Sequence, residues 1–172
     1  MNRRILLSVA IALLLILALP WLTEQTRVIY LTLQHGTTLT DVALQFEVVT
    51  NALSGSRETY YYDERLKFSF VATGSALRGR LGYWDSVWEE SPANHPNLNL
   101  ITDQRLSDVR VLEYDDDQAK MSAWIRWHFR SVNRDTMLTK HENDAAAECS
   151  YRFAFEDDMW KVAEVECAGP TE

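Results

Sequence analysis

Residues 146–168, with the sequence AAECSYRFAFEDDMWKVAEVECA, indicate how the chain folds. Aromatic and aliphatic residues alternate with polar ones on both sides of a short acidic segment. This alternation is typical of two half-buried β-strands joined by a turn. It predicts strands at Ala146–Glu156 and Trp160–Ala168, with the turn at Asp157–Met159.

The length of this turn determines which residues oppose each other across the hairpin. A two-residue turn puts Cys149 and Cys167 on opposite faces of the hairpin. A three-residue turn at Asp157–Met159 places the two cysteines directly opposite each other, and Arg152 opposite Glu164. Both turn lengths are common, and the charge pairing favours the second register.

Cys149 and Cys167 are candidates for a disulfide in that second register, because opposed residues of antiparallel strands lie within bonding distance. The exported compartment predicted below favours the bond as well. Two separate thiols, one of them buried, are the alternative.

Two more strands are predicted upstream, at Arg105–Tyr114 and Ala119–Val132, joined by a turn at Asp115–Gln118. The Pro, Asn and Ser content of Ser91–Thr102 predicts a loop before them. In the Ala119–Val132 strand one face is apolar, with Met121, Ala123, Ile125, Trp127 and Phe129.

Helices are predicted ahead of the strands. Thr38 and Asp41 fit a capping box, and apolar residues then recur at helical spacing to Ser54–Gly55; they are Val42, Phe46, Val49 and Leu53. Asp63–Ala72 reads as a second helix, and Ser75 caps a third that carries Leu77, Leu81, Trp84 and Trp88 on one face. Helices followed by a run of strands predict an α+β fold, with about three helices packed on a four-stranded antiparallel sheet.

The N-terminus carries eighteen uncharged residues, Ile5–Leu22, which as a helix span about 27 Å. A cleaved signal peptide is the alternative, but no small-x-small cleavage site follows the run. We therefore expect a transmembrane anchor. Arg3 and Arg4 precede it, and the positive-inside rule places them in the cytoplasm.

This topology predicts four parts: a cytoplasmic stub at residues 1–4, an anchor at 5–22, a connector at 23–37 and an exported domain at 38–172. The connector includes Arg27–Gln34, which has no strong helical or strand period and could extend a helix or form a short strand. The predicted location is the cytoplasmic membrane, with the domain outside the cytoplasm.

Charge excludes some classes of partner. The chain has 17 basic and 25 acidic residues, a net charge of −8. Without Arg3 and Arg4 the remainder holds 15 basic and 25 acidic residues, a net charge of −10. A domain this acidic repels phosphate backbones and anionic lipid headgroups, so nucleic acid is not an expected partner.

The three helices, the antiparallel strands and the ending YRFAFEDDMWKVAEVE resemble the cone fold of the nuclear-transport-factor-2-like proteins. Phe70–Leu77 (FVATGSAL), Tyr83-Trp84 and the closing hairpin are similar to the IMS-type domain of the chloroplast-division membrane proteins and their bacterial relatives. The resemblance covers Leu39–Cys167. It implies a domain that lies across a membrane from the stroma or cytoplasm and binds a partner protein. The predicted topology leaves only residues 1–4 in the cytoplasm, whereas the division proteins have a large cytoplasmic region, so their cytoplasmic scaffolding role is not expected here.

Patterns for metal or cofactor chemistry are not evident in the sequence. The four histidines share no metal-ligand spacing, and two cysteines cannot form a structural zinc site alone. An enzyme would use the cone cavity or His128, which lies in a predicted strand between Arg126 and Arg130. No aspartate is visibly placed to orient that histidine. We expect no cofactor and no catalysis.

The polar face of the Ala119–Val132 strand is the candidate partner-binding face. An indole and two guanidinium groups on one strand face are typical of protein interfaces, although an ordinary solvated sheet face is an equal alternative. The residues of this face are Ser122, Trp124, Arg126, His128 and Arg130.

The sequence thus predicts a membrane-anchored, noncatalytic binding module, an accessory subunit that contacts protein partners in or at the membrane. The lipid bilayer is contacted through Ile5–Leu22, and self-association is compatible with this layout. The alternative is a carrier of a small apolar ligand, or an isomerase- or dehydratase-like enzyme, that uses the cone cavity.

Overall fold

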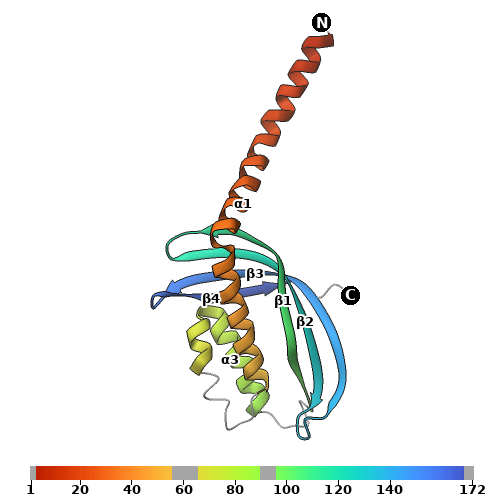
Figure 1. The fold of residues 1–172 in the computed structure, drawn as a ribbon, viewed down its shortest axis with the longest axis vertical. Coiled ribbons are helices and arrows are strands. Elements are labelled where there is room, and N and C mark those ends of the chain that lie inside the picture. Colours follow the sequence, from red (N-terminus) through yellow and green to blue (C-terminus); the bar gives the residue numbers. More distant parts are fainter. Residues whose placement is uncertain (1–2, 56–65, 90–95, 169–172) are drawn as a thin grey trace.

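The computed structural model describes the backbone of residues 3–55, 66–89 and 96–168 (Figure 1). Side chains are described for the same residues except 3–17, 51–55, 84, 87–88 and 99–102. Its helices are α1 (Arg3–Gly55) and α3 (Gly74–Glu89), and residues 66–71 are also helical. Its strands are β1 (Asn97–Tyr114), β2 (Gln118–Asn133), β3 (Thr139–Glu156) and β4 (Met159–Cys167).

The strands form one sheet in the order β1-β2-β3-β4, and each strand is antiparallel to the next. The sheet is curled, and the C-terminal part of α1 lies with α3 inside the curl (Figure 1). The N-terminal part of α1 projects away from the sheet. The predicted α+β fold with an antiparallel meander is confirmed.

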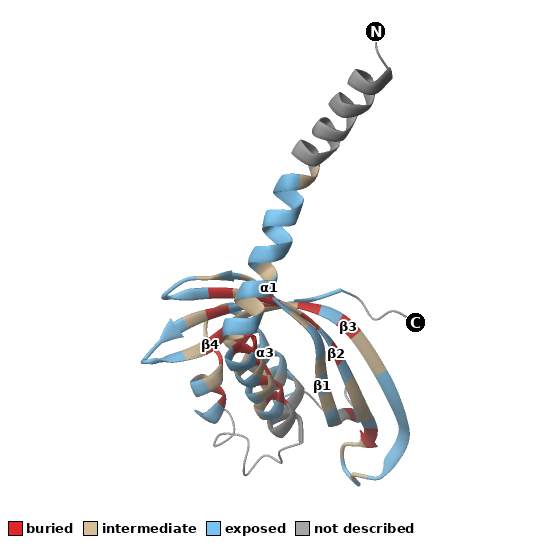
Figure 2. Ribbon diagram, turned by 45° about the horizontal axis from the view of Figure 1, so that its top comes forward, coloured by how far each residue is buried: buried red, intermediate tan, exposed pale blue. Residues whose placement is uncertain are grey.

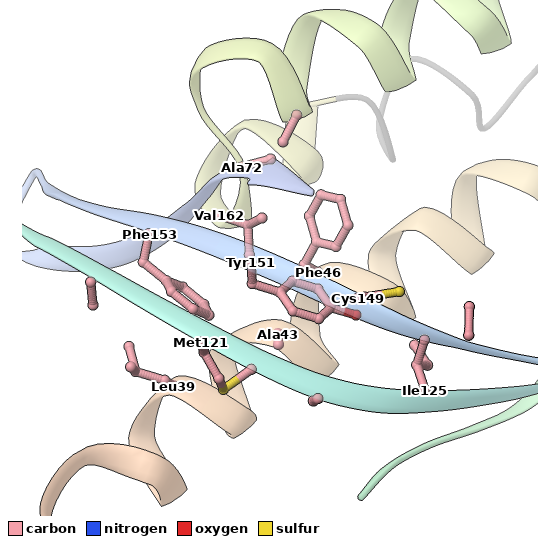
Figure 3. Packing of buried hydrophobic residues seen from close by; sticks show 14 of the residues in the cluster. Leu39, Ala43, Phe46, Ala72, Met121, Ile125, Cys149, Tyr151, Phe153 and Val162 are labelled. Carbon is pink, nitrogen blue, oxygen red and sulfur yellow. The ribbon is translucent and has the colours of Figure 1, made fainter. Parts of the chain in front are cut away.

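The core lies between the curled sheet and α1 (Figure 3). The predicted apolar face of β2 is buried at Met121, Ala123 and Ile125. Apolar side chains from the other elements complete the core, among them Leu39, Ala43, Phe46, Phe68, Tyr151, Phe153 and Val162. Strand alternation located this core because successive side chains of a strand point to opposite faces.

Helix α1 differs from the prediction, because no helix begins at Thr38. That residue is exposed in the interior of a 53-residue helix, and the capping-box prediction was wrong. The connector is helical as well: Leu31 packs against the core, and His35 stacks on Tyr114 with ring centroids 3.5 Å apart. These tertiary contacts stabilise helix where the local sequence has no clear period.

The buried face of α1 is also rotated relative to the prediction. Phe46 is buried as expected, but Val42 and Val49 are half-buried, and the side chain of Leu53 lies outside the described residues. In α3, Leu77 and Leu81 pack against the core. The side chains of Trp84 and Trp88 are likewise outside the described part of the chain.

Two strands begin earlier than predicted. The expected loop Ser91–Thr102 is strand from Asn97 onward, and β3 begins at Thr139 rather than Ala146. Both extensions pair with β2, from Asn97 opposite Asn133 to Thr139 opposite Val132. Backbone pairing with a long neighbour thus outweighs the low strand propensity of asparagine and glutamate there.

The closing hairpin combines the two predicted registers. Asp157 and Asp158 have φ values of 55° and 63° and form a two-residue turn that opposes Phe155 to Trp160. The register then shifts by one residue between Phe153 and Arg152, which leaves Ala163 without a directly paired residue. Beyond this bulge the pairs are those of the longer turn, with Arg152 opposite Glu164 and Cys149 opposite Cys167.

The bulge forms the attachment point for the start of α3. Thr73 donates its backbone N–H to the Val162 carbonyl at 2.8 Å, and Ser75 donates its hydroxyl to the Ala163 carbonyl at 3.1 Å. Gly74 has a φ of 54°, and a Cβ there would lie 3.1 Å from the Ala163 oxygen. A glycine is therefore required by both the backbone conformation and the close approach.

Most of the predicted anchor falls on residues whose side chains lie outside the described part. The helical backbone of α1 does include Ile5–Leu22. Within the described residues, no helix is both long enough and apolar enough to cross a membrane.

Candidate functional site

The five predicted face residues alternate along β2 with the buried Met121, Ala123 and Ile125, so they point to the opposite side of the sheet. Helix α3 and the C-terminal part of α1 lie on the inner side of the curled sheet (Figure 2). Trp124 is 37% exposed, Arg126 and Arg130 are exposed, and Ser122 and His128 are half-buried. Directly opposed residues of antiparallel strands share a face, so the neighbours on β1 and β3 extend it. We call this surface the outer face; its charged, polar and aromatic residues are Asp103, Arg105, Ser107, Arg110 and Glu113 of β1, Lys120, Ser122, Trp124, Arg126, His128 and Arg130 of β2, and Glu142, Asp144, Glu148, Ser150 and Arg152 of β3.

Positive charge is concentrated on the β1–β2 half of the outer face. Arg105 lies directly opposite Arg126, and Arg110 lies directly opposite Ser122. Trp124 follows on the same face of β2. Like charges directly opposite each other across a sheet destabilise it, and Asp103 offsets part of this repulsion because it pairs with Arg105 at 3.1 Å.

The β3 half of the outer face is acidic. Glu142, Asp144 and Glu148 oppose Arg130, His128 and Trp124. The outer face is therefore mainly basic along β1 and β2, with an indole, and mainly acidic along β3; Asp103 and Glu113 on β1 and Arg152 on β3 carry the opposite sign. A partner segment that carries both charge signs, or acidic side chains toward β1, would complement this division.

His128 has the carboxylate neighbour that the sequence did not reveal. Its Nδ1 lies 2.7 Å from Asp144 Oδ1, and its Nε2 lies 3.9 Å from Glu142 Oε2. Asp144 was missed because the predicted strand began at Ala146; a longer β3 would have placed it opposite His128. His141 also lies in β3.

A groove of about 600 Å³ continues the outer face toward β4. Its polar lining includes Arg110, Lys120, Ser122, Glu148, Ser150 and Glu166. Cys149 and Cys167 lie at the same place and are joined by a disulfide in the structure. The bond ties the end of β4 to β3 beside the groove, with Cys149 buried and Cys167 exposed.

On the inner side of the sheet, the structure contains a buried acid that the sequence did not predict. Glu47 of α1 is 2% exposed and accepts a hydrogen bond from the Tyr151 hydroxyl at 3.2 Å. Burial raises the pKa of Glu47, while the Arg80 charge and hydrogen bonding by Trp127 and Tyr151 act in the opposite direction. Burial, followed by the nearby Glu47, also raises the pKa of Tyr151.

The position of Glu47 on the helix is the sequence feature that could have predicted its burial. It lies four residues after Ala43 and three before Thr50, both buried, so helical spacing places it on the core-facing stripe. The burial of Glu47 was not predicted because glutamate is usually exposed.

A groove of about 440 Å³ lies between α1, α3 and β4; Phe46, the residue before Glu47, lines it, whereas Glu47 itself is not part of the lining. Its lining mixes apolar and charged side chains, among them Phe46, Ala76, Arg80, Tyr83, Glu164 and Val165. Arg80 both lines the groove and acts on the charge of Glu47. The volume is at the lower end of the range of small-molecule sites.

As for metal chemistry, the described residues include no group of three or more His, Cys, Asp or Glu side chains that could hold an ion. The Asp144–His128–Glu142 group on the outer face is thus a charge and hydrogen-bond cluster on a sheet surface.

Comparison with solved structures finds proteins of similar fold. The structure is similar to the crystal structure of the intermembrane space region of the chloroplast protein ARC6, with a TM-score of 0.55 and 13% sequence identity. The similarity covers 76% of this chain and 94% of that one. No family model and no curated protein matches the sequence. At this identity the likeness shows the fold alone: a curled antiparallel sheet with helices, shared with a domain from a compartment between membranes.

Proposed function

We propose that this protein is a membrane-anchored, noncatalytic binding module whose domain contacts another protein within a membrane-associated complex. The observation that carries the proposal is the outer face, where Trp124 and Arg126 are exposed on a side of the sheet that neither α1 nor α3 covers. The fold likeness to an intermembrane-space domain agrees with a role at a membrane.

The composition of the outer face suggests the chemistry of the partner. Tryptophan and arginine dominate the energy of protein interfaces because each combines a large contact area with directional polar groups. Arg126 lies opposite Arg105, whose guanidinium already pairs with Asp103 at 3.1 Å, so a partner carboxylate would bind at Arg126. The expected partner segment is therefore acidic, with an aromatic or aliphatic side chain against Trp124.

Anchoring is proposed through Ile5–Leu22, with the N-terminus in the cytoplasm and the domain on the other side of the membrane. Support comes from the eighteen uncharged residues and from Arg3 and Arg4 ahead of them. Because α1 continues from this run into the domain, the outer face would be held at a defined orientation to the bilayer.

The double variant Trp124→Ala/Arg126→Glu tests the outer face. Affinity purification of the full chain from mild detergent, followed by mass spectrometry, should recover a stoichiometric partner with the wild type and lose it with the variant. The matched control Phe70→Ala/Arg78→Glu removes an exposed aromatic ring and reverses a charge elsewhere, and it should keep the partner. Equal recovery with both variants would dismiss the outer face.

A second function is favoured by the groove beside Glu47: binding of a small apolar ligand, with or without isomerase- or dehydratase-like chemistry. A buried acid with a raised pKa next to a groove is a pattern found in ligand and proton-transfer sites. Native mass spectrometry of the purified chain discriminates between the two functions. A monomer that carries a small molecule supports the second, and a stoichiometric protein partner supports the first.

A further inference from the structure

The projecting part of α1 carries an apolar stripe that begins in the last turns of the predicted anchor, at Leu19 and Leu22, and continues beyond it to Ile29 and Leu33. Leu22, Ile29 and Leu33 are all more than half exposed, Leu33 reaching 81%. With Leu19 and Thr26, they occupy positions 19, 22, 26, 29 and 33, an alternation of three and four residues. This is the a/d spacing of a coiled coil, which allows side chains to interlock with those of a second helix.

The stripe points away from the sheet. Contacts with the domain come from other positions of α1: Arg27 donates a hydrogen bond to the Leu112 carbonyl at 2.9 Å, and Thr32 accepts one from the Val111 N–H at 2.8 Å. Leu31 and His35 also face the domain. The face with Ile29 and Leu33 is thus open to another helix while the domain stays packed.

We infer that the stripe is the contact of a parallel homodimer, in which α1 of a second copy of this chain packs along Leu19–Leu33. Charge supports a second copy as the occupant. The segment carries one acid and one base, Glu24 and Arg27, and they pair with each other at 3.0 Å within the helix. Two such segments therefore meet without net charge, although each domain as a whole is strongly acidic.

Thr26, the polar residue of the stripe, is compatible with a contact between two α1 helices. Thr26 donates its hydroxyl to the Leu22 carbonyl at 2.8 Å, so it enters an apolar contact without an unsatisfied donor. The positions that flank the stripe, among them Thr23, Gln25, Tyr30 and Thr32, carry no charge that would repel an identical helix.

The parallel alignment rests on the membrane anchor proposed above; Ile29 and Leu33 lie outside that anchor, and their exposure does not depend on it. If Ile5–Leu22 spans the bilayer in every copy, all copies of α1 leave the membrane in the same direction and at the same height. The seam would then continue the apolar run outward, and Leu33 would lie about 16 Å beyond Leu22. This pre-alignment compensates for a stripe of only two heptads, which is short for independent association.

Cross-linking in native membranes tests the dimer. The variant Leu33→Cys should form a covalent dimer on mild oxidation, because d and a positions of parallel helices face their own copies. The control Gln34→Cys introduces a cysteine at the adjacent residue, which lies outside the stripe, and should remain largely monomeric. Cys149 and Cys167, the two cysteines of the chain, are joined in the structure and do not compete.

A second measurement does not depend on cysteine chemistry. Ile29→Glu/Leu33→Glu should halve the protein mass that light scattering reports for the full chain in detergent, whereas Gln34→Glu should leave the dimer mass unchanged. Both variants change exposed positions, and an unaltered unfolding temperature verifies the fold. A monomeric wild type, equal cross-linking at residues 33 and 34, or a cross-link to a different protein would each overturn the proposal.

Failure of the dimer and failure of the anchor give different results. If the Leu33→Cys chain stays in the membrane pellet after alkaline extraction but gives no covalent dimer, the anchor is supported and the dimer is contradicted. If the chain is found in the supernatant, the anchor is contradicted, and the mass that light scattering reports for the extracted chain still shows whether it dimerises through the stripe.

Discussion

Glu47 is an ionisable residue surrounded by apolar side chains between α1 and the sheet. The Tyr151 hydroxyl and the Arg80 charge each favour its carboxylate, but removal from water outweighs them, and the pKa of Glu47 is raised from the usual 4.5. A raised pKa in the folded state means that the folded chain holds this proton more tightly than the unfolded chain does.

Glu47→Gln should stabilise the domain increasingly as pH rises. Above about pH 4.5 the unfolded chain loses the Glu47 proton while the folded chain keeps it, so the wild type loses free energy of unfolding until the folded pKa is passed. Inside that window the slope is about 1.4 kcal/mol per pH unit. Urea unfolding of both proteins from about pH 4 to pH 8 measures it.

Glu113→Gln is the control, because Glu113 is exposed. Its stability difference from the wild type should stay small over the same range. A Glu47→Gln difference that does not vary with pH would contradict the burial of an ionisable group.

At the scale of elements, both edges of the sheet are covered by short hydrogen-bonded attachments. On β1, Thr32 and Arg27 of α1 bind the Val111 N–H and the Leu112 carbonyl. On β4, the start of α3 binds at the Ala163 bulge through Ser75. Exposed edges invite pairing with other chains, and these attachments cover β1 at Val111 and Leu112 and β4 at the Ala163 bulge.

Asp158→Gly should stabilise the closing hairpin by up to about 1 kcal/mol. Asp158 has a φ of 63°, and a left-handed conformation costs a side-chain-bearing residue about 1–2 kcal/mol, part of which the greater freedom of glycine in the unfolded chain offsets. Asp157 is kept because it pairs with Lys161 at 2.7 Å. Thermal unfolding measures the gain.

Asp116→Gly provides the comparison, since Asp116 lies in the β1–β2 turn and does not have a positive φ. This substitution should not raise the unfolding temperature. An equal gain from both substitutions would show that the backbone of the Asp157–Asp158 turn is not the cause.

Removal of the disulfide by Cys149→Ala/Cys167→Ala should lower the free energy of unfolding by about 3 kcal/mol. The two cysteines are 18 residues apart, and a cross-link over a loop of that size restricts the unfolded chain by about this amount. Urea unfolding of the variant, and of the wild type with and without reductant, measures the loss. The intact mass of the wild type should increase by two hydrogens on reduction, and an unchanged mass would mean that the bond does not form.

At the scale of the whole molecule, α1 has two roles. From Leu31 onward it packs into the curl of the sheet, whereas residues 19–27 are exposed. One helix therefore links the domain to the apolar run without an intervening loop (Figure 1). Movement of the domain against the anchor would require bending the helix.

Deletion of residues 1–22 should leave the domain folded and release it from membranes. Because residues 19–22 are exposed, the free energy of unfolding should change by no more than about 0.5 kcal/mol. Urea unfolding measures this, and ultracentrifugation of cell extracts measures membrane retention. A truncated chain that still sediments with membranes would contradict anchoring through Ile5–Leu22.

Much of the fold could be predicted from local pattern. Alternation along β2 identified Met121, Ala123 and Ile125 as core, and the acidic segment between two alternating runs located the closing turn. These predictions succeeded because the period of a strand is a property of consecutive residues, and burial of one face requires it.

The tertiary structure alone decided the remaining features, because each depends on residues far apart in the chain. The bulge at Ala163 lets one hairpin adopt two registers and bind Ser75, which no turn rule specifies. Asp144 reaches His128 only because β3 is lengthened by pairing with β2. Local sequence sets which face a residue occupies, whereas long-range packing sets what lies opposite it, and the outer face is made of such opposed pairs.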